Sequence, residues 1–348
     1  MEKNEISLMR ISSKALCMLA FALALLFVMF PVSAGDFSSQ QLIPLGKTTG
    51  IKLFSEGTMI VGFEEIAQGS ASPAQKAGLE CGDVILSVNG KEVESNGSLT
   101  SIMSELEDGR AEVVYERSGE QKSCTVSAVY DKERERWMMG AWVRDSMAGI
   151  GTITYVDPET GRFGALGHGI CDVDTGGLMP FEEGGLMPSS VIGVKKGIQG
   201  TPGELTGAFD TASDQGTVQS NSSGGIFGTL SDESLYSGEE ALPLMKKSEI
   251  VPGKAQILAN VEGESQKAYG IEIVRVYPEN DSSMRDMMIQ VTDKELLEKT
   301  GGIVQGMSGS PIIQNGKLAG AVTHVLINDP CRGYGISIER MLAQDNFQ

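Results

Sequence analysis

Residues 301–322 read GGIVQGMSGSPIIQNGKLAGAV. Ser308 has a glycine two positions before it and another directly after it, so the chain can make a tight turn there that exposes the serine hydroxyl. In such a turn the N–H groups of Gly306 and Ser308 point to one side, where they can stabilise a developing oxyanion. The apolar segments on either side of Asn315-Gly316 predict a β-hairpin. The stretch therefore predicts a nucleophile loop that leads into the strands of a β-barrel.

A serine hydroxyl is a weak nucleophile without a base, and the chain has only two histidines. His168 lies between Gly167 and Gly169, which leave room for another loop to approach the ring closely. His324 lies in the apolar segment 321–325, whose alternation is typical of a barrel wall. We therefore predict His168 as the general base and keep His324 as the alternative.

The third member of a catalytic triad would be a carboxylate that holds the imidazole tautomer. Spacing alone does not choose among the aspartates between His168 and Ser308, which include Asp172, Asp174, Asp210, Asp214 and Asp293. Asp293 also has an ordinary alternative role, because it precedes a short helical pattern and could cap it.

The region around these residues, 137–348, predicts an all-β domain. It has 17 glycines between Gly161 and Gly228 and short β-branched segments such as 150–156. Helical patterns are limited to 293–298 and 338–342. Many short strands at close spacing favour a barrel or sandwich. The charged run DKERER at 131–136 is interpreted as a solvated connector between this domain and an earlier one.

The earlier domain spans about 42–130. Strands are expected at 50–54, 58–63, 81–90 and 111–117, and helices at 72–79 and 98–107. The string SPAQKAGLECGDVILSVNGKEV resembles a PDZ domain of the circularly permuted kind attached to bacterial proteases. A PDZ domain binds an extended peptide as an added strand and holds its terminal carboxylate with backbone N–H groups. The strand expected to receive that peptide is Met59, Ile60, Val61, Gly62 and Phe63; alternatively, these are interior strand residues without a peptide partner.

Composition limits the number of domains and the kinds of partner and cofactor that the chain could have. The 348 residues suggest about two domains, and 41% hydrophobic with 21% charged residues excludes wholesale disorder. A net charge of −18 excludes nucleic acid as a partner. With two histidines and five scattered cysteines, no metal and no cofactor is expected.

The amino terminus predicts export. Lys3, Arg10 and Lys14 precede an apolar run at 15–30, which is followed by the small residues of 31–34. Residues 1–34 are therefore a signal peptide, the favoured interpretation, or a membrane anchor.

The motifs together carry a family resemblance. GMSGSP resembles the nucleophile loop of chymotrypsin-like proteases. Together with FGALGHGICDVDTG, GTPGELTGAF and the block from 291 to 330, it is similar to the stage IV sporulation protein B family of serine peptidases. The sequence departs from the family pattern in its short carboxy-terminal tail after residue 342.

This resemblance implies a mainly β chain, with a signal or anchor segment (1–34), a PDZ domain (42–130) and a chymotrypsin-like double β-barrel peptidase domain (137–348). The implied catalytic residues are His168, Asp293 and Ser308, with Gly306 and Ser308 forming the oxyanion hole. The implied place of action is the space between mother cell and forespore, or the membrane bordering it. The implied substrates are the protein itself and a membrane-bound regulator of the intramembrane protease that activates sigma-K. The alternative is a non-catalytic exported PDZ scaffold that binds the tails of membrane proteins.

Overall fold

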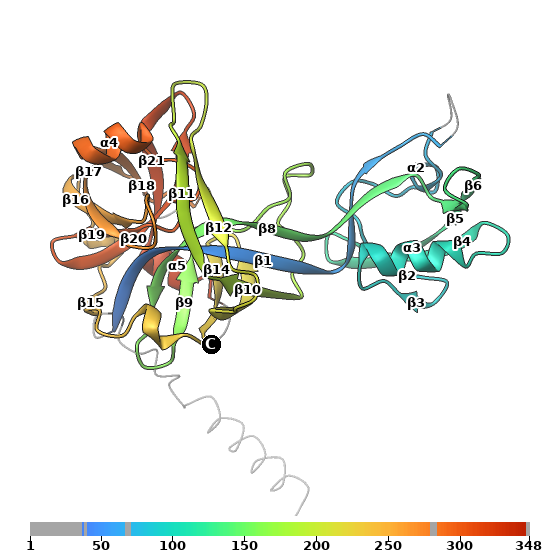
Figure 1. The fold of residues 1–348 in the computed structure, drawn as a ribbon, viewed down its shortest axis with the longest axis horizontal. Helices are drawn as coiled ribbons and strands as arrows, with labels where there is room; N and C mark the ends of the chain where they lie inside the picture. The colour runs from blue at the N-terminus through green and yellow to red at the C-terminus, as the bar shows by residue number, and fades with distance from the viewer. Residues whose placement is uncertain (1–36, 38–39, 67–70, 279–283, 346–348) are drawn as a thin grey trace, which may run out of the picture. The chain divides into compact units, whose positions relative to one another are not determined.

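The computed structural model describes residues 37, 40–66, 71–278 and 284–345. The predicted signal or anchor segment, 1–34, lies outside these residues. Within them, no helix is both long enough and apolar enough to cross a bilayer. The fold is mainly β, with two six-stranded barrels and a PDZ domain, as predicted (Figure 1).

The first barrel is a closed ring of six strands in the order β10-β13-β14-β9-β8-β1, in which β1 also pairs with β10. These strands are β1 (Gln41–Phe63), β8 (Ala141–Val156), β9 (Arg162–Ala165), β10 (Glu183–Met187), β13 (Gly216–Ser222) and β14 (Gly225–Leu230). Its core contains Leu45, Leu53, Phe163, Leu186 and Ile226. Strand β9 leads directly into the loop that carries His168.

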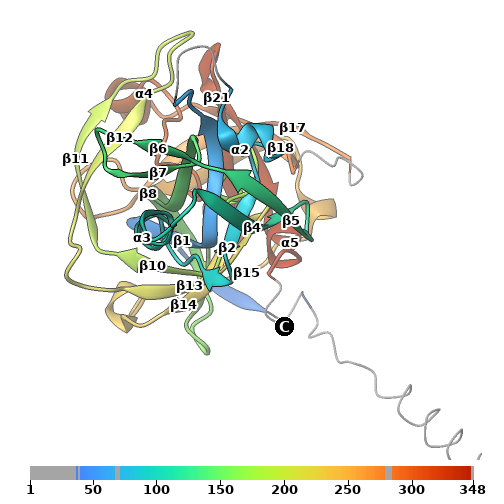
Figure 2. The ribbon, with the colours of Figure 1, turned by 90° about the vertical axis from the view of Figure 1, so that its right-hand side faces the viewer.

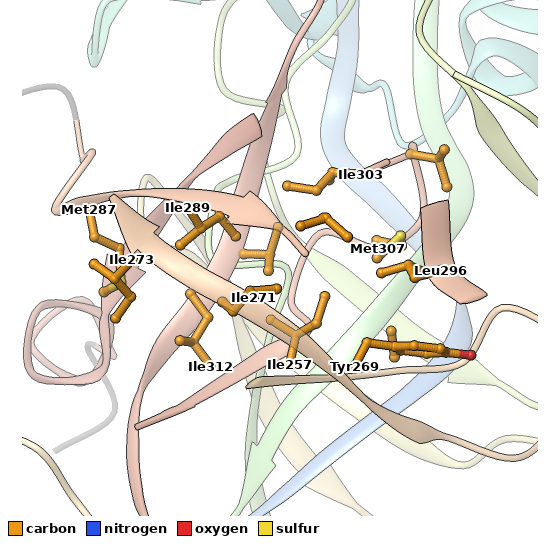
Figure 3. Packing of buried hydrophobic residues seen from close by; sticks show 14 of the residues in the cluster. Ile257, Tyr269, Ile271, Ile273, Met287, Ile289, Leu296, Ile303, Met307 and Ile312 are labelled. Atoms are coloured by element: carbon orange, nitrogen blue, oxygen red, sulfur yellow. The ribbon is translucent and has the colours of Figure 1, made fainter. Parts of the chain in front are cut away.

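The second barrel is closed by six antiparallel strands in the order β16-β17-β18-β21-β20-β19. They are β16 (Gly253–Ala259), β17 (Lys267–Val276), β18 (Met287–Val291), β19 (Pro311–Gln314), β20 (Lys317–Leu326) and β21 (Asp329–Ser337). Figure 3 shows Ile257, Ile271, Ile289 and Ile312 converging on its core, together with Met307. Because Met307 is buried there, it anchors the loop that carries Ser308.

The shorter elements connect these barrels. β11 (Ser189–Lys195) and β12 (Glu204–Phe209) form a hairpin, and β15 (Leu242–Pro243) pairs with β1. Two 3₁₀ turns, η1 (Glu233–Leu235) and η2 (Lys247–Glu249), precede the second barrel. Helices α4 (Lys294–Thr300) and α5 (Ile338–Leu342) match the two short helical patterns of the sequence.

The PDZ core is a separate apolar cluster. Its elements are α2 (Pro73–Lys76), β2 (Val84–Val88), β3 (Lys91–Glu92), α3 (Asn96–Ser104), β4 (Arg110–Arg117) and β5 (Glu120–Ser127). Pro73 begins α2, and the Ser72 hydroxyl caps it by accepting a hydrogen bond from the Gln75 N–H. Helix α3 packs Leu99, Ile102 and Met103 into the cluster.

The charged run 131–136 is the turn of a hairpin rather than a connector between domains. β6 (Val129–Asp131) pairs with β7 (Arg136–Met138), and the Asp131 carboxylate accepts hydrogen bonds from two backbone N–H groups in the turn. Met139 is buried in the PDZ core, and Trp137, Ala141 and Val143 pack against it. Figure 2 shows α3 beside β7 and β8. The packed PDZ core therefore reaches beyond the predicted end at 130.

The strand predicted to receive a peptide, Met59 to Phe63, is paired with β8 along one edge and is also covered on the other edge at Met59 and Ile60. It is the last part of β1, which is a single 23-residue strand. Met59, Ile60, Gly62 and Phe63 pair with β8 on one edge. On the other edge Met59 pairs with Val84 of β2, while Ile60 exchanges hydrogen bonds with Asp83 and Gly82. An added strand is therefore excluded at Met59 and Ile60, where neighbouring strands occupy both edges.

Candidate active site

Ser308 and His168 line the same cavity, which has a volume of about 550 Å³. Ser308 comes from the loop before β19 of the second barrel, and His168 from the loop after β9 of the first barrel. The cavity walls are predominantly apolar: Ile150, Leu166, Pro202, Ile303, Val304, Val325 and Ile327. Among the described residues that line it, there is no aspartate, glutamate, lysine or arginine.

One residue of β8, Thr152, holds both loops. Its N–H donates to the Ser308 carbonyl oxygen at 3.1 Å, and its hydroxyl donates to the Gly306 carbonyl oxygen at 2.7 Å. Its own carbonyl oxygen accepts from the N–H of Leu166 at 3.1 Å, two residues before His168. Thr152 is buried, so these bonds are shielded from water. The relative positions of the Ser308 loop and the His168 loop are therefore fixed through one strand.

The glycine after Ser308 is required by this close approach. Gly309 has a φ of 96°, and a Cβ at this position would lie 2.0 Å from the Thr152 carbonyl oxygen and 2.6 Å from the Leu166 nitrogen. Any side chain would therefore push the two loops apart.

The hydroxyl of Ser308 donates a hydrogen bond to the Thr323 carbonyl oxygen at 2.7 Å. No hydrogen bond joins it to either histidine in this structure. The amide nitrogens of Gly306 and Ser308 donate no hydrogen bond to any residue that the structure describes, and both residues line the cavity. Two free N–H donors beside a serine hydroxyl are what an oxyanion hole requires.

His168 is held in one tautomer by its neighbour. Its Nδ1 lies 2.9 Å from the Gly169 carbonyl oxygen. Because a carbonyl oxygen only accepts, Nδ1 carries the proton and Nε2 keeps its lone pair. Burial lowers the pKa of His168 below its ordinary value, although the bond to Gly169 opposes this shift. The ring is therefore a neutral base at neutral pH.

His324 lies against His168, with ring centroids 4.8 Å apart. Desolvation lowers the pKa of His324 to about 4, and electrostatic interactions with the neighbouring His168 and with the Arg285 guanidinium lower it further. His324 lies on β20, as predicted for a barrel wall, and it stays neutral beside His168. The proximity of the two histidines was not predicted, because they are 156 residues apart in the chain.

Asp293 is not brought to His168. It caps helix α4: Oδ1 accepts from the Leu296 N–H at 3.1 Å, and Oδ2 accepts from the Gly270 N–H at 3.4 Å. It does not line the cavity, and within the described residues no carboxylate bonds to either histidine. The predicted triad of His168, Asp293 and Ser308 is therefore not assembled here. The hydrogen bond from His168 Nδ1–H, which a carboxylate was expected to accept, is accepted by the Gly169 carbonyl oxygen instead.

The other candidate aspartates have different partners. Asp172 is buried, binds the Arg144 guanidinium, and accepts from the N–H groups of Asp174 and Thr175. Asp174 binds the same Arg144 at 2.8 Å. Desolvation opposes ionisation of Asp172, but the hydrogen bonds from Thr175, the Arg144 charge and the Asp174 N–H together hold the pKa of Asp172 below its ordinary value. Arg144, on β8, was not anticipated from the sequence, because it meets this loop only through the fold.

Comparisons with known proteins agree with this architecture. The family model described as SpoIVB peptidase S55 matches residues 135–342, and a PDZ domain model matches 65–117. The zinc metalloprotease RasP of Shouchella clausii is 38% identical over 82 residues, which are 23% of this chain. The match covers about a fifth, 19%, of that relative's own length.

Solved structures are similar at low identity. The active form of the Rv3671c protease from M. tuberculosis has 16% identity and a TM-score of 0.31, covering 58% of this chain and 73% of that one. The PDZ domain of the SdrC-like protein from Listeria monocytogenes has 16% identity and a TM-score of 0.22, covering 25% of this chain and 87% of that one.

Proposed function

Because this chain belongs to the SpoIVB peptidase S55 family, we propose that it is an exported serine endopeptidase with Ser308 as nucleophile and His168 as general base. The observation that carries the proposal is the junction at Thr152, which fixes the Ser308 and His168 loops around one cavity with two free amide donors. Self-processing, cleavage of a membrane-bound regulator and a role in sigma-K activation are the biological setting we propose from the family.

The proposed reaction begins when the Ser308 hydroxyl turns from the Thr323 carbonyl towards Nε2 of His168. Serine Oγ then bonds to the carbonyl carbon of the scissile peptide, while its proton passes to Nε2. The N–H groups of Gly306 and Ser308 stabilise the oxyanion, and the Gly169 carbonyl accepts from Nδ1–H of the imidazolium. His168 next protonates the leaving amine, and the C–N bond breaks to give an acyl-enzyme. Water, activated by the same ring, hydrolyses the ester.

The cavity lining favours an apolar substrate side chain next to the scissile bond. Ile303, Val304, Val325 and Ile327 supply apolar contact, and no charged residue of the lining could pair with a charged substrate group. Burying an unpaired charge against such a wall is unfavourable by several kcal/mol. We therefore propose cleavage beside residues of the size of leucine or methionine.

The proposal is tested by incubating the purified protein with unstructured peptides that differ at one position, and mapping the products by mass spectrometry. Ser308→Ala should reduce turnover by about 10⁶. Ser310→Ala is the matched control: Ser310 is fully buried and its hydroxyl has no partner among the described residues, so its loss should be mild. Cleavage by Ser308→Ala at the wild-type rate would contradict the assignment, and no cleavage by any form would favour the scaffold alternative.

A further inference from the structure

His324 lies where the pairing of strand β20 is irregular. Strand β20 pairs with β21 at Val322 and again at Val325, and the register of the two strands shifts between these residues. Thr323 and His324 therefore form a β-bulge, which points side chains in directions that a regular strand does not allow. Thr323 is buried and His324 is exposed, and both residues line the cavity that contains Ser308. The bulge thus places two consecutive residues of β20 at the candidate active site.

These two residues contact both catalytic side chains. The Thr323 carbonyl oxygen accepts the hydrogen bond from the Ser308 hydroxyl at 2.7 Å. The His324 ring packs against the His168 ring, with centroids 4.8 Å apart and 36° between the ring planes. This arrangement is closer to stacking than to an edge-to-face contact, and among the described residues no hydrogen bond joins the two rings. His324 therefore contacts His168 through its ring face and not through a nitrogen atom.

A ring packed against a general base matters because the base becomes charged during the reaction. In the proposed mechanism His168 is neutral at first and then takes the proton of Ser308. A neutral aromatic ring within about 6 Å attracts a cation over its face, whereas a second positive charge at that distance repels it. The His324 ring can therefore stabilise the imidazolium of His168 only while His324 itself is neutral.

The surroundings of His324 keep its ring neutral. Desolvation is the largest cause that lowers its pKa to about 4, followed by electrostatic interactions with His168 and Arg285. Arg285 precedes β18 and lies over the ring of Tyr334, which comes from β21. From the loop after β9, the titratable groups in the cavity are His168 and the Cys171 thiol. Since no carboxylate is among the described lining residues, nothing in the cavity would stabilise a positive charge on His324.

We propose that His324 is a positioning residue for the serine peptidase reaction: its ring packs on one face of His168, excludes water from that face, and stabilises the imidazolium that forms when Ser308 attacks. This role rests on the proposed peptidase function. The two parts of the His168 environment then have separate tasks, because the Gly169 carbonyl orients Nδ1–H and His324 covers the ring face. An apolar aromatic ring at position 324 should support the reaction, and a fixed positive charge there should not.

The contact between the rings is tested by NMR titration of the full chain, which requires no catalysis. Because the chain has two histidines, a sample with isotope-labelled histidine gives two ring signals, and each variant at position 324 gives the His168 signal alone. His324→Ala uncovers His168, so the His168 pKa should rise towards its ordinary value of about 6.5. His324→Phe keeps the face covered and should leave that pKa unchanged, whereas His324→Lys adds a like charge and should lower it further. The same His168 pKa in all four proteins would overturn the proposed contact.

The role in the reaction is tested by the kinetics and pH dependence of peptide cleavage. His324→Phe should keep kcat within about threefold of the wild-type value, because the ring face is preserved. His324→Lys should lower kcat by about 100-fold with little change in KM, because the repulsion acts only once His168 is charged. The acid limb of kcat/KM should move to higher pH in His324→Ala and to lower pH in His324→Lys.

Asn328→Lys is the matched control for the added charge. Asn328 is exposed in the turn after β20 and does not line the cavity, so the same change of charge is made away from His168. This variant should keep kcat and the acid limb of the wild-type protein.

Two results would overturn the role of the ring. Equal kcat in the wild type and His324→Lys would show that a charge beside His168 does not matter. A loss in His324→Phe as large as that in His324→Lys would show that His324 acts through a nitrogen atom. The peptidase function fails in a different way: the His168 pKa would shift among the variants as expected, but no form would cleave any peptide. That outcome would contradict the serine peptidase assignment and leave the packing of the two rings supported.

Discussion

Replacing Gly309 by alanine tests the contact that places the catalytic loops. The new Cβ would lie 2.0 Å from the Thr152 carbonyl oxygen, whereas such contacts do not occur below 3.0 Å, so the loop must move by about 1 Å. The movement opens the 3.1 Å hydrogen bond between the Leu166 N–H and the Thr152 carbonyl. The variant should therefore have both a lower free energy of unfolding and a poorer alignment of Ser308 with His168.

The expected magnitude has three sources. A left-handed φ costs a non-glycine residue about 1 kcal/mol, a lost buried hydrogen bond about 1–3 kcal/mol, and overpacking about 1–3 kcal/mol. Since these effects overlap, we expect Gly309→Ala to lower the free energy of unfolding by about 4 kcal/mol. A 1 Å displacement of reacting groups should also lower kcat/KM by about 100-fold.

Gly316→Ala is the control, because Gly316 also has a positive φ of 74° but a Cβ there would meet nothing within 4 Å. It should lower the free energy of unfolding by only about 1 kcal/mol and leave kcat/KM nearly unchanged. Urea unfolding followed by far-UV circular dichroism and cleavage of an unstructured peptide measure both quantities. Equal stability and activity of the two variants would refute the close approach at Thr152.

Three further changes probe other parts of the account. Asp293→Asn should keep the melting temperature and kcat/KM within a few-fold, because asparagine caps a helix as well as aspartate; a loss of about 10⁴ in turnover would show that Asp293 reaches His168 in the active state. Because burial lowers the pKa of His168, kcat/KM should rise with pH and reach half its maximum below pH 6.5, and a midpoint above 6.5 would contradict a desolvated base. The buried Asp286 carboxylate forms ion pairs with Lys247 and Arg340. Asp286→Ala removes both ion pairs and should lower the free energy of unfolding by about 3–5 kcal/mol, so a loss under about 1 kcal/mol in urea unfolding would be inconsistent with a stabilising network.

Local patterns predicted much of the fold correctly. The Asn315-Gly316 turn joins β19 and β20, and the pattern with proline at a helix start gives α2 of the PDZ domain. Glycines around Ser308 and His168 correctly indicated loops that approach closely, and both residues line one cavity. The helix-cap alternative for Asp293 was also visible in the sequence, since a capping residue and its helix are adjacent in the chain.

The features that the sequence did not predict depend on contacts between distant segments. Strand β1 pairs with β8 across about 100 residues of chain, so no local pattern reveals which edge of Met59–Phe63 is covered. Two other sets of contacts depend on where the fold places β8. Arg144 meets Asp172, and Thr152 forms its three hydrogen bonds, only because β8 lies next to the Ser308 loop and the His168 loop. The role of the Gly169 carbonyl in orienting His168 could not be predicted either, because every residue has a backbone carbonyl whatever its side chain.

The central claim is that Ser308 is an activated nucleophile. Labelling the purified protein with a fluorophosphonate and locating the adduct by mass spectrometry tests it directly, because an unactivated hydroxyl does not react at a useful rate. We predict a single adduct on the Ser308 Oγ, absent from Ser308→Ala and strongly slowed in His168→Ala. No adduct in the wild-type protein, or an adduct that persists in Ser308→Ala at another serine, would contradict the account.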